Sequence, residues 1–310
     1  MKKSILVFFS GLLFSSLLLS QDVHFSQPYS SPLNLNPAFA GSSGCARAVA
    51  GYRTQWVGFQ GTPKTFFASY DQYVNFLKGG VGINYYNDKF GDAFMTNRMD
   101  AIYSAHIPFF KGRCVFKPAA EVSFVNKREK VYLLNWGTSS PQAQPSQPFF
   151  TSNHFLDLSF GGLLYSKRIF VGTAFHHINE PEEGFFSQSR LPMKYTFHLG
   201  GNIGKVDSAK AFVVTPSLLY VQQEDFREFA MSCKVRYDKF SIGAGYRNND
   251  ALILSAGFQY NRVKIEYSYD TDISGLKSSS FGSPHEISLA FTFNCKNETE
   301  GKLFLHNTPF

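Results

Sequence analysis

Apolar and polar residues alternate along most of this chain with a period of two. Near the end, Ile287, Leu289, Phe291 and Phe293 fall on one face, and the small or polar residues between them fall on the other. The same alternation recurs upstream, for example in 228–237. Strict alternation is the signature of a strand with one apolar face, and no long amphipathic helix competes with it. The chain is therefore predicted to be all-β.

About fourteen segments carry this pattern, and their connections differ in length in an ordered way. The predicted strands are 45–57, 63–73, 79–88, 95–108, 113–125, 153–166, 168–178, 194–204, 209–222, 226–237, 239–248, 251–260, 262–270 and 284–294. Connections after even-numbered strands are short, whereas three connections after odd-numbered strands are long, namely 126–152, 179–193 and 271–283. This sorting is typical of an up-and-down antiparallel transmembrane β-barrel, with short periplasmic turns and longer extracellular loops. A soluble β-sandwich also alternates, but it has no reason to sort its loops.

Composition favours a membrane barrel over a soluble domain. Only 17% of the residues are charged, while 17% are aromatic, and soluble domains average roughly a quarter charged residues. A lysine on the lipid side at the bilayer midplane costs roughly 2–4 kcal/mol. Lys234, Arg236, Lys264 and Glu266 are therefore expected to face the lumen. The lumen is then either wet and charged or plugged by a polar segment.

The two ends of the chain are predicted to lie outside the wall. Residues 1–20 combine a basic start, an apolar run and a small final residue, which predicts a secretory signal peptide. A retained signal anchor is the alternative, although the run is short for one. Residues 21–44, rich in Ser, Pro and Asn, form an N-terminal segment expected either in the periplasm or inside the lumen. The barrel is assigned to 45–294, and 295–310 form a C-terminal tail.

Basic residues recur in the predicted short turns. The expected basic rim on the periplasmic side consists of Lys78, Lys111, Arg113, Lys167, Arg168, Lys205, Lys239 and Arg262. Clustered charge of one sign steers an oppositely charged partner, so this rim is a candidate docking collar for an acidic periplasmic protein. Solvated turn residues beside lipid headgroups are the plainer alternative. No nucleic-acid-binding motif accompanies the net charge of +7.

The four cysteines are Cys45, Cys114, Cys233 and Cys295, and none shows the C-x-x-C spacing of a zinc site. In a closed barrel the first and last strands are neighbours, which places Cys45 and Cys295 near the same rim. They are candidates for a disulfide, provided that their Cα atoms come within about 7 Å. Cys233 is expected to face lipid.

Five short motifs stand in order along the chain. They are QDVHFSQ at 21–27, LNPAFAG at 35–41, YRTQW at 52–56, GTPKT at 61–65 and HEISL at 285–289. Together they resemble the PorP/SprF family of Bacteroidetes outer-membrane proteins, which is associated with type IX secretion and gliding motility, over roughly residues 21–293. The resemblance implies a barrel that cooperates with periplasmic ring lipoproteins, or with secreted surface proteins and adhesins. The motif residues that it marks for interaction are Phe25, Asn36, Pro37, Gly41, Arg53, Gln55, Trp56, Pro63, Thr65, His285 and Glu286.

Several motif residues also have plain structural explanations. Trp56 lies where an aromatic girdle favours tryptophan. Arg53 and Gln55 should point into the lumen, where they either grip a plug or are solvated. Asn36 with Pro37 is a turn signal, and Glu286 is expected to form a lumenal ion pair.

Sequence motifs of catalysis are missing, since the chain has neither a G-x-S-x-G elbow nor an H-E-x-x-H motif. His176 and His177 are adjacent on a predicted strand, so they should point to opposite faces and not share a metal. A lipase whose Ser and His come from different strands remains open. No cofactor or metal is expected.

We interpret the chain as a non-enzymatic outer-membrane barrel of the type IX secretion and gliding machinery, embedded in lipid. Its predicted role is to dock a periplasmic ring component or a secreted surface protein. A channel or porin for solutes is the alternative, because a charged lumen would allow conduction.

Overall fold

The computed structural model describes residues 22, 24–55, 57–58, 61–130, 150–185, 188–205, 211–248, 250–272 and 282–293. The strands are β1 (Arg47–Thr54), β2 (Lys64–Val74), β3 (Gly79–Phe90), β4 (Phe94–Ala105), β5 (Ile107–Phe109), β6 (Cys114–Lys130), β7 (Phe150–Ser166), β8 (Ile169–His176), β9 (Lys194–Gly201), β10 (Ile203–Gly204), β11 (Val213–Gln223), β12 (Phe226–Tyr237), β13 (Phe240–Arg247), β14 (Ala251–Tyr260), β15 (Val263–Asp272) and β16 (His285–Thr292). Three helical turns precede them: η2 (Pro28–Ser30), α2 (Pro32–Leu35) and η3 (Pro37–Phe39). Within the described part of the chain, no helix is long and apolar enough to span a membrane.

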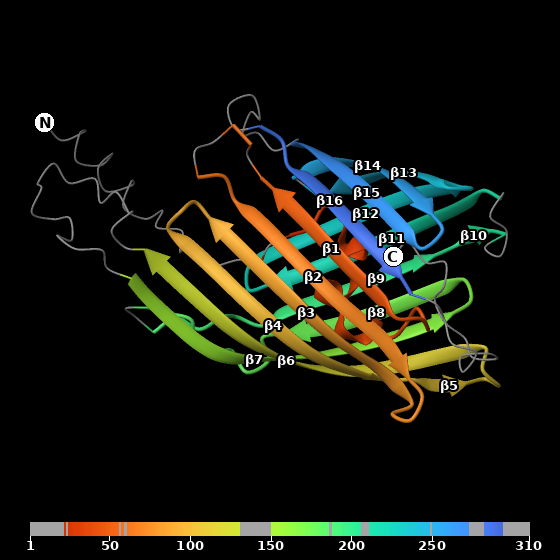
Figure 1. Cartoon of the computed structure of the whole chain (residues 1–310), viewed down its shortest axis with the longest axis horizontal. Coiled ribbons are helices and arrows are strands. Elements are labelled where there is room, and N and C mark those ends of the chain that lie inside the picture. The colour runs from red at the N-terminus through yellow and green to blue at the C-terminus, as the bar shows by residue number, and fades with distance from the viewer. Residues whose placement is uncertain are drawn as a thin grey trace, which may run out of the picture.

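The strands close into one antiparallel barrel (Figure 1). β1 pairs with β2 on one side and with β16 on the other, and β9 pairs with β11, so the ring of strands is closed. β5 and β10 are short continuations of β4 and β9, because they pair with β6 and β11 in the same register as the strands before them. The wall therefore has fourteen positions, as predicted from the alternation.

The connections are short at one end of the barrel and long at the other, as expected. The turns between β2 and β3, β5 and β6, β7 and β8, β12 and β13, and β14 and β15 are all short and lie at the end where β5 and β10 lie (Figure 1). The three longest connections, 131–149, 177–193 and 273–284, join strands at the opposite end. We call these the short-turn end and the long-loop end.

Most strand boundaries differ from the prediction by a few residues, and the largest difference is at the end of β6. β6 continues to Lys130 and β7 starts at Phe150, so this hairpin is longer at the long-loop end than the predicted 113–125 and 153–166. The added part of β6, 126–130, has the sequence Asn-Lys-Arg-Glu-Lys. These charged residues interrupt the apolar alternation, so the sequence pattern did not predict this part of the strand. Backbone pairing nevertheless continues along the whole hairpin, from Cys114↔Ser166 to Lys130↔Phe150.

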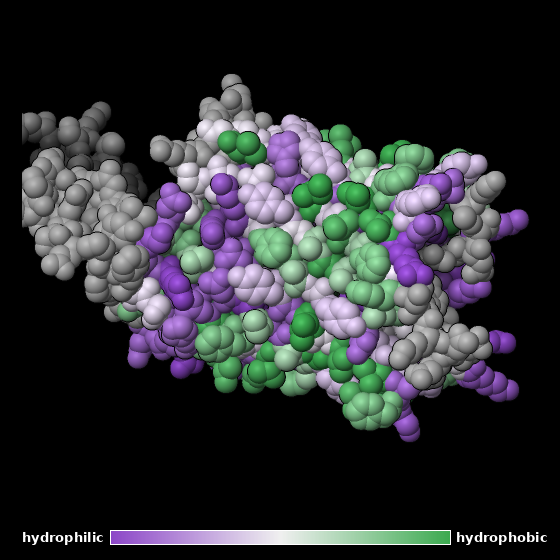
Figure 2. All heavy atoms as spheres, viewed as in Figure 1, coloured by the Kyte–Doolittle hydropathy of each residue, from purple (hydrophilic) through white to green (hydrophobic). Residues whose placement is uncertain are grey.

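The two faces of the wall differ in polarity. Large apolar side chains such as Ile83, Met99 and Leu254 face outward and are exposed, whereas Asp100 and Glu121 point into the lumen and are buried. Figure 2 shows hydrophobic side chains over the middle of the wall and hydrophilic ones gathered toward the strand ends. An apolar outer band with polar ends matches a bilayer, because lipid penalises charge on the outer face.

The N-terminal segment fills the lumen. Its described residues between Asp22 and Gly44, which we call the plug, contact strands all around the ring: β7, β8, β9 and β11 on one side, and β2, β4, β15 and β16 on the other. The plug starts at the long-loop end and descends to the short-turn end, where β1 begins. The prolines at the start of each helical turn set the backbone angle for these short turns.

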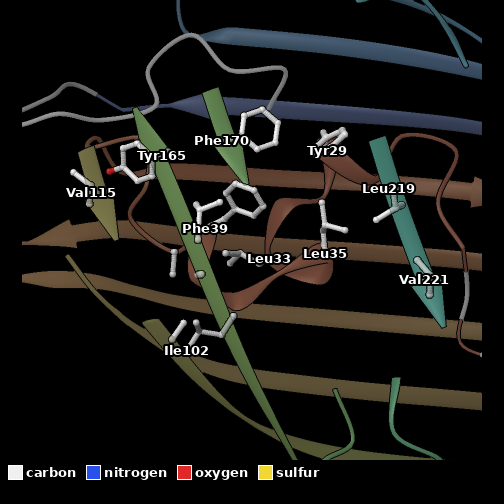
Figure 3. Packing of buried hydrophobic residues seen from close by; sticks show 14 residues of the cluster. Tyr29, Leu33, Leu35, Phe39, Ile102, Val115, Tyr165, Phe170, Leu219 and Val221 are labelled. Atoms are coloured by element: carbon white, nitrogen blue, oxygen red, sulfur yellow. The ribbon is translucent and has the colours of Figure 1, made fainter. Parts of the chain in front are cut away.

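A small apolar core forms between the plug and the wall (Figure 3). Leu33 and Phe39 of the plug are fully buried and pack in the same cluster as Leu163, Tyr165 and Phe170 of β7 and β8. Burying a leucine or phenylalanine side chain stabilises by roughly 1.5–3 kcal/mol. The middle of the lumen is therefore occupied by packed side chains of the plug and the wall.

Candidate functional site

The plug is held at its outer end by a buried ionic cluster. Arg53 on β1 forms ion pairs with Glu286 on β16 at 3.4 Å and with Asp270 on β15 at 3.2 Å. Glu286 also accepts hydrogen bonds from the backbone N–H groups of Ser26 at 2.7 Å and Gln27 at 3.3 Å, and Arg53 donates to the Ser26 hydroxyl. Arg53 and Glu286 are each only 1% exposed. The expected lumenal position of both residues is what the structure shows, and they grip the plug.

The same cluster continues around the ring. Arg247 on β13 donates to Asp270 at 3.0 Å and lies 3.9 Å from Glu228 on β12. Glu228 in turn contacts Nδ1 of His24 at 3.2 Å. Charges from five strands are thus neutralised by one another and by the plug, which is the condition for burying them.

Halfway down the lumen, Glu266 on β15 forms a second anchor. It accepts a hydrogen bond from the Ser30 hydroxyl at 2.6 Å and ion-pairs with Lys234 at 2.5 Å and Lys264 at 3.2 Å. These three charged residues were expected in the lumen, and Arg236 shares the lumenal face of β12 with Lys234. The lumenal wall is charged, and these charges form ion pairs with one another and a hydrogen bond with the plug.

Asn36 locks the central turn of the plug. Its side-chain oxygen accepts the Ala38 N–H at 2.8 Å and caps η3, which Pro37 begins. Its amide nitrogen donates to the carbonyls of Gly162 at 3.1 Å and Thr173 at 3.0 Å. The Asn-Pro turn signal therefore does more than end a segment, since it fixes the plug to β7 and β8.

Glycines let the plug backbone approach the wall at the short-turn end. Gly41 has a positive φ of 67°, and its N–H donates to Asp71 at 2.8 Å. A Cβ on Gly80 of β3 would lie 2.0 Å from the Ala40 carbonyl oxygen, so only glycine fits there. Asp71 also pairs with Arg47 of β1 at 2.9 Å, which ties the end of the plug to the first strand.

At the outer mouth, Asp22 anchors the start of the plug. His177 places Nε2 3.0 Å from Asp22 and Nδ1 2.7 Å from Asp157, and Lys194 also contacts Asp22. Burial by itself lowers the pKa of His177, but the charge of Asp22 and the hydrogen bond to Asp157 outweigh it, and the pKa is raised. Burial raises the pKa of Asp22, but Lys194 and His177 hold it well below its ordinary value.

The expectation that His176 and His177 point to opposite faces is wrong. Both are buried, and their rings lie 6.3 Å apart. β8 ends at His176, and His177 adopts a positive φ of 59°, so the strand alternation no longer applies to it. Among the described residues, no group of three or more His, Cys, Asp or Glu side chains is arranged so that it could hold a metal ion.

A polar cavity of about 140 Å³ borders this anchor at the long-loop end. Asp22 and Phe25 of the plug line it, together with Arg98, Lys127 and His177 of the wall and loops. Phe25 also packs edge-on against Phe67 with ring centroids 5.1 Å apart. The cavity is a recess above the plug, since the apolar core lies beneath it.

The eight residues of the basic rim lie at the short-turn end, and all are exposed. Lys78 and Lys111 have positive φ angles of 49° and 58°, as tight hairpin turns require. Lys239 stacks over the Tyr260 ring at 4.8 Å. The structure thus gathers turn residues from six connections at one end of the barrel.

The remaining motif residues occupy structural positions near the long-loop end. The Gln55 N–H donates to the Pro63 carbonyl at 3.0 Å and extends the β1–β2 pairing, while Thr65 donates to Asp88 at 2.7 Å. His285 contacts the Tyr267 hydroxyl at 2.6 Å. Trp56, Cys295, the predicted signal peptide and the C-terminal tail lie outside the described residues.

Cysteine states are partly defined. Cys45 is disulfide-bonded, whereas Cys114 and Cys233 are free thiols, with Cys233 exposed. Because Cys295 lies outside the described residues, the pairing of Cys45 with Cys295 stays a prediction.

Most of the wall residues that hold or surround the plug were not predicted to do so from the sequence. Asp270, Glu228 and Arg247 each fall on the lumenal side of an alternating strand, so their orientation was predictable. Their clustering around the N-terminal segment, which Glu228 contacts through His24, was not predictable, because such contacts join distant parts of the chain: Ser26 and Glu286 are 260 residues apart.

Comparisons with solved structures return other outer-membrane barrels. Omp33 of Acinetobacter baumannii aligns with 82% of this chain and 100% of its own, at 11% identity and a TM-score of 0.46. The CymD monoaromatic hydrocarbon channel aligns with 86% of this chain and 94% of its own, at 10% identity and a TM-score of 0.46. No functionally curated protein matches the chain.

A family model does match, and it covers nearly the whole barrel and the plug. The model describes the type IX secretion system membrane protein PorP/SprF and aligns with residues 18–291. The short-turn end is therefore periplasmic and the long-loop end extracellular, as in other outer-membrane barrels. The chain belongs to the PorP/SprF family of type IX secretion system membrane proteins, and it resides in the outer membrane.

Proposed function

We propose that this protein is a non-enzymatic docking barrel of the type IX secretion and gliding machinery. It engages a periplasmic ring component or a secreted surface protein through its rims and not through an open lumen. The observation that carries this proposal is the plug, which is fixed to the wall at its outer end by Glu286, halfway by Glu266 and Asn36, and at its inner end by Asp71.

A filled lumen leaves the two ends of the barrel as working surfaces. At the periplasmic end, the basic rim offers eight exposed cationic side chains around one circumference. Such a ring of charge attracts an acidic surface and raises its rate of association. An acidic face on a periplasmic ring lipoprotein is the partner that fits it.

The proposal is tested by reversing charge on the rim. The triple variant Lys78→Glu, Lys111→Glu and Lys239→Glu changes three separate turns. It should weaken co-purification of the periplasmic partner, with the loss largest at low salt, because exposed charges are screened within about 10 Å at 0.1 M salt.

A matched variant controls for net charge. Lys64→Glu, Lys89→Glu and Arg128→Glu alter three exposed cations at the opposite end of the same wall. Both variants should insert into the outer membrane and keep the wild-type shift between heated and unheated gel mobility. Equal partner recovery from the two variants would remove the docking role of the rim and leave its residues as solvated turns beside lipid headgroups.

A solute channel or porin is the competing function, and it makes the opposite claim about the lumen. Conduction needs a continuous aqueous path, whereas Leu33, Phe39 and Phe170 pack against one another across the centre. Steady large currents through the purified wild-type protein in planar bilayers would favour the channel over the docking barrel.

A further inference from the structure

At the long-loop end, β7 extends beyond the pairing with β8 but not beyond the pairing with β6. Against β6 it is paired along its whole length, out to Lys130↔Phe150. Against β8 the outermost pair is Phe160↔Phe175. About ten residues at the outer end of β7 therefore lack β8 as a partner, and the wall has a step at this point of its extracellular rim.

The segment after β8 covers the lower part of this step. The Ile178 N–H donates to the Leu158 carbonyl at 3.0 Å, and the Asn179 side chain bonds the Leu158 N–H at 2.9 Å and the Leu156 carbonyl at 2.8 Å. These contacts also fix which residues face the step. Because backbone groups alternate along a strand, the N–H and C=O groups of Ser152 and His154 point the same way.

The upper part of the edge has no backbone partner among the described residues. Among the described residues, no backbone hydrogen bond reaches Ser152 or His154 from the side of the step, and both residues are exposed. In the nearby loop, the carbonyls of Glu182 and Gly184 accept instead from the Asn153 side chain, which lies on the lumenal face of β7 with Asp157. A short row of backbone donors and acceptors is thus presented to the cell exterior.

The sequence of this edge lacks the usual protection. Proteins blunt free edges with lysine, proline or a bulge, but 150–155 reads Phe-Thr-Ser-Asn-His-Phe, with no proline, glycine, lysine or acid. The edge also stands clear of the hydrocarbon. Its register partner Arg128 on β6 is exposed on the outer face, where a charge at membrane depth would be costly.

We propose that the outer edge of β7, around Ser152 and His154, is a docking site for an extended segment of a secreted surface protein, which adds to the sheet as a further strand. Strand addition is an established mode of peptide recognition in which the main chain provides affinity and alternate side chains provide specificity. The occupant follows from the chemistry, since alternating N–H and C=O groups at strand spacing are satisfied by another extended backbone. Its origin follows from the location at the extracellular rim. The identity of the partner as a secreted protein rests on the proposed function.

The test distinguishes binding through the edge backbone of β7 from binding through the side chain of His154. A photo-crosslinking amino acid is placed at Ser152, and His154 is changed either to Pro or to Ala. Both variants lose the imidazole, including its contact with Asn126. Only H154P loses the edge N–H, and because that group points away from β6, the β6–β7 hairpin keeps its ladder.

Irradiation of intact cells should crosslink the Ser152 position to a surface protein in the H154A background. H154P should reduce that product by about tenfold, since it removes an edge hydrogen bond and its ring obstructs the approaching strand. Equal yields from H154P and H154A, or crosslinks only to this chain's own residues, would overturn the inference. Partner recovery through the basic rim is measured in the same cells, so a failure of strand addition is distinguishable from a failure of the docking function.

Discussion

Arg53 on β1 and Glu286 on β16 face each other in register across the seam where the first and last strands of the barrel meet. Glu286 also receives the backbone N–H groups of Ser26 and Gln27. The same carboxylate therefore helps to close the wall and to seat the plug. Because the pair is buried, its partners must all be present, since an isolated buried charge is far more costly than the pair is stabilising.

Removing Arg53 should destabilise the barrel strongly. Arg53→Ala leaves Glu286 buried without its cation, while Asp270 keeps Arg247 alone. Breaking a buried ion pair by removing one partner typically costs about 3–5 kcal/mol. Urea unfolding in lipid vesicles, followed by tryptophan fluorescence and gel mobility, measures the free energy of unfolding. Arg128→Ala is the control, because Arg128 is exposed on the outer end of β6.

Glu286→Gln should lower the free energy of unfolding less than Arg53→Ala does, since Arg53 retains Asp270 and the amide oxygen still accepts the Ser26 N–H. The double variant should then lose less than the sum of the two single losses, because both remove one interaction. Additive losses would show that Arg53 and Glu286 do not act on each other.

Displacing the plug should turn the barrel into a channel. A Cβ on Gly161 would lie 2.2 Å from the Asn36 side-chain oxygen and 3.0 Å from Pro37, whereas a Cβ on the adjacent Gly162 meets nothing closer than 3.7 Å. Gly161→Val should therefore expel the centre of the plug and give steady conductance in planar bilayers. The wild type and Gly162→Val should stay silent.

Both glycine variants carry the same side chain at neighbouring positions on opposite faces of β7, so strand propensity does not separate them. Insertion is checked by heat-modifiable gel mobility before the current is measured. A properly inserted Gly161→Val barrel without conductance would contradict the view that the plug alone closes the lumen.

How much of the structure could be predicted from the sequence depends on whether a residue contacts lipid, water or other parts of the protein. Lipid outside and polar contacts inside impose a period of two on every wall strand, so the strand count and the inward position of Lys234 were predictable. The plug meets neither lipid nor bulk water on one regular face. Its path is set by distant contacts, such as Ser26 with Glu286 and Ser30 with Glu266, which no local pattern contains. His177 was misplaced because the strand ends one residue before it.

The disulfide across the seam remains a specific prediction. Cys45 is disulfide-bonded and precedes Ala46, whose carbonyl accepts the Phe293 N–H at 2.8 Å. We expect mass spectrometry of unreduced peptides to join the peptide of Cys45 to that of Cys295. Cys45→Ser should lower the free energy of unfolding by about 2–5 kcal/mol, while Cys233→Ser should not, because Cys233 is an exposed free thiol. Joining of Cys45 to any other peptide would refute the pairing.

The anchor at the outer mouth should make the start of the plug sensitive to pH. Each ring nitrogen of His177 faces a carboxylate, Nε2 toward Asp22 and Nδ1 toward Asp157, so both must donate and the ring is cationic. The pKa of His177 is raised above the ordinary 6.5. Its contribution to stability is then complete below that ordinary value and is lost as pH rises through the raised pKa.

Asp22 sets the lower limit of the same window. Its pKa is depressed by Lys194 and His177 against the opposing effect of burial, so its contribution is lost as pH falls through the depressed value. Amide hydrogen exchange of 24–27, corrected for the intrinsic rate at each pH, should show greatest protection between the two limits. His177→Gln should remove the decline on the alkaline side and leave the acid side in place, because Lys194 still pairs with Asp22. Protection that does not change with pH in the wild type would mean that this cluster does not hold the plug.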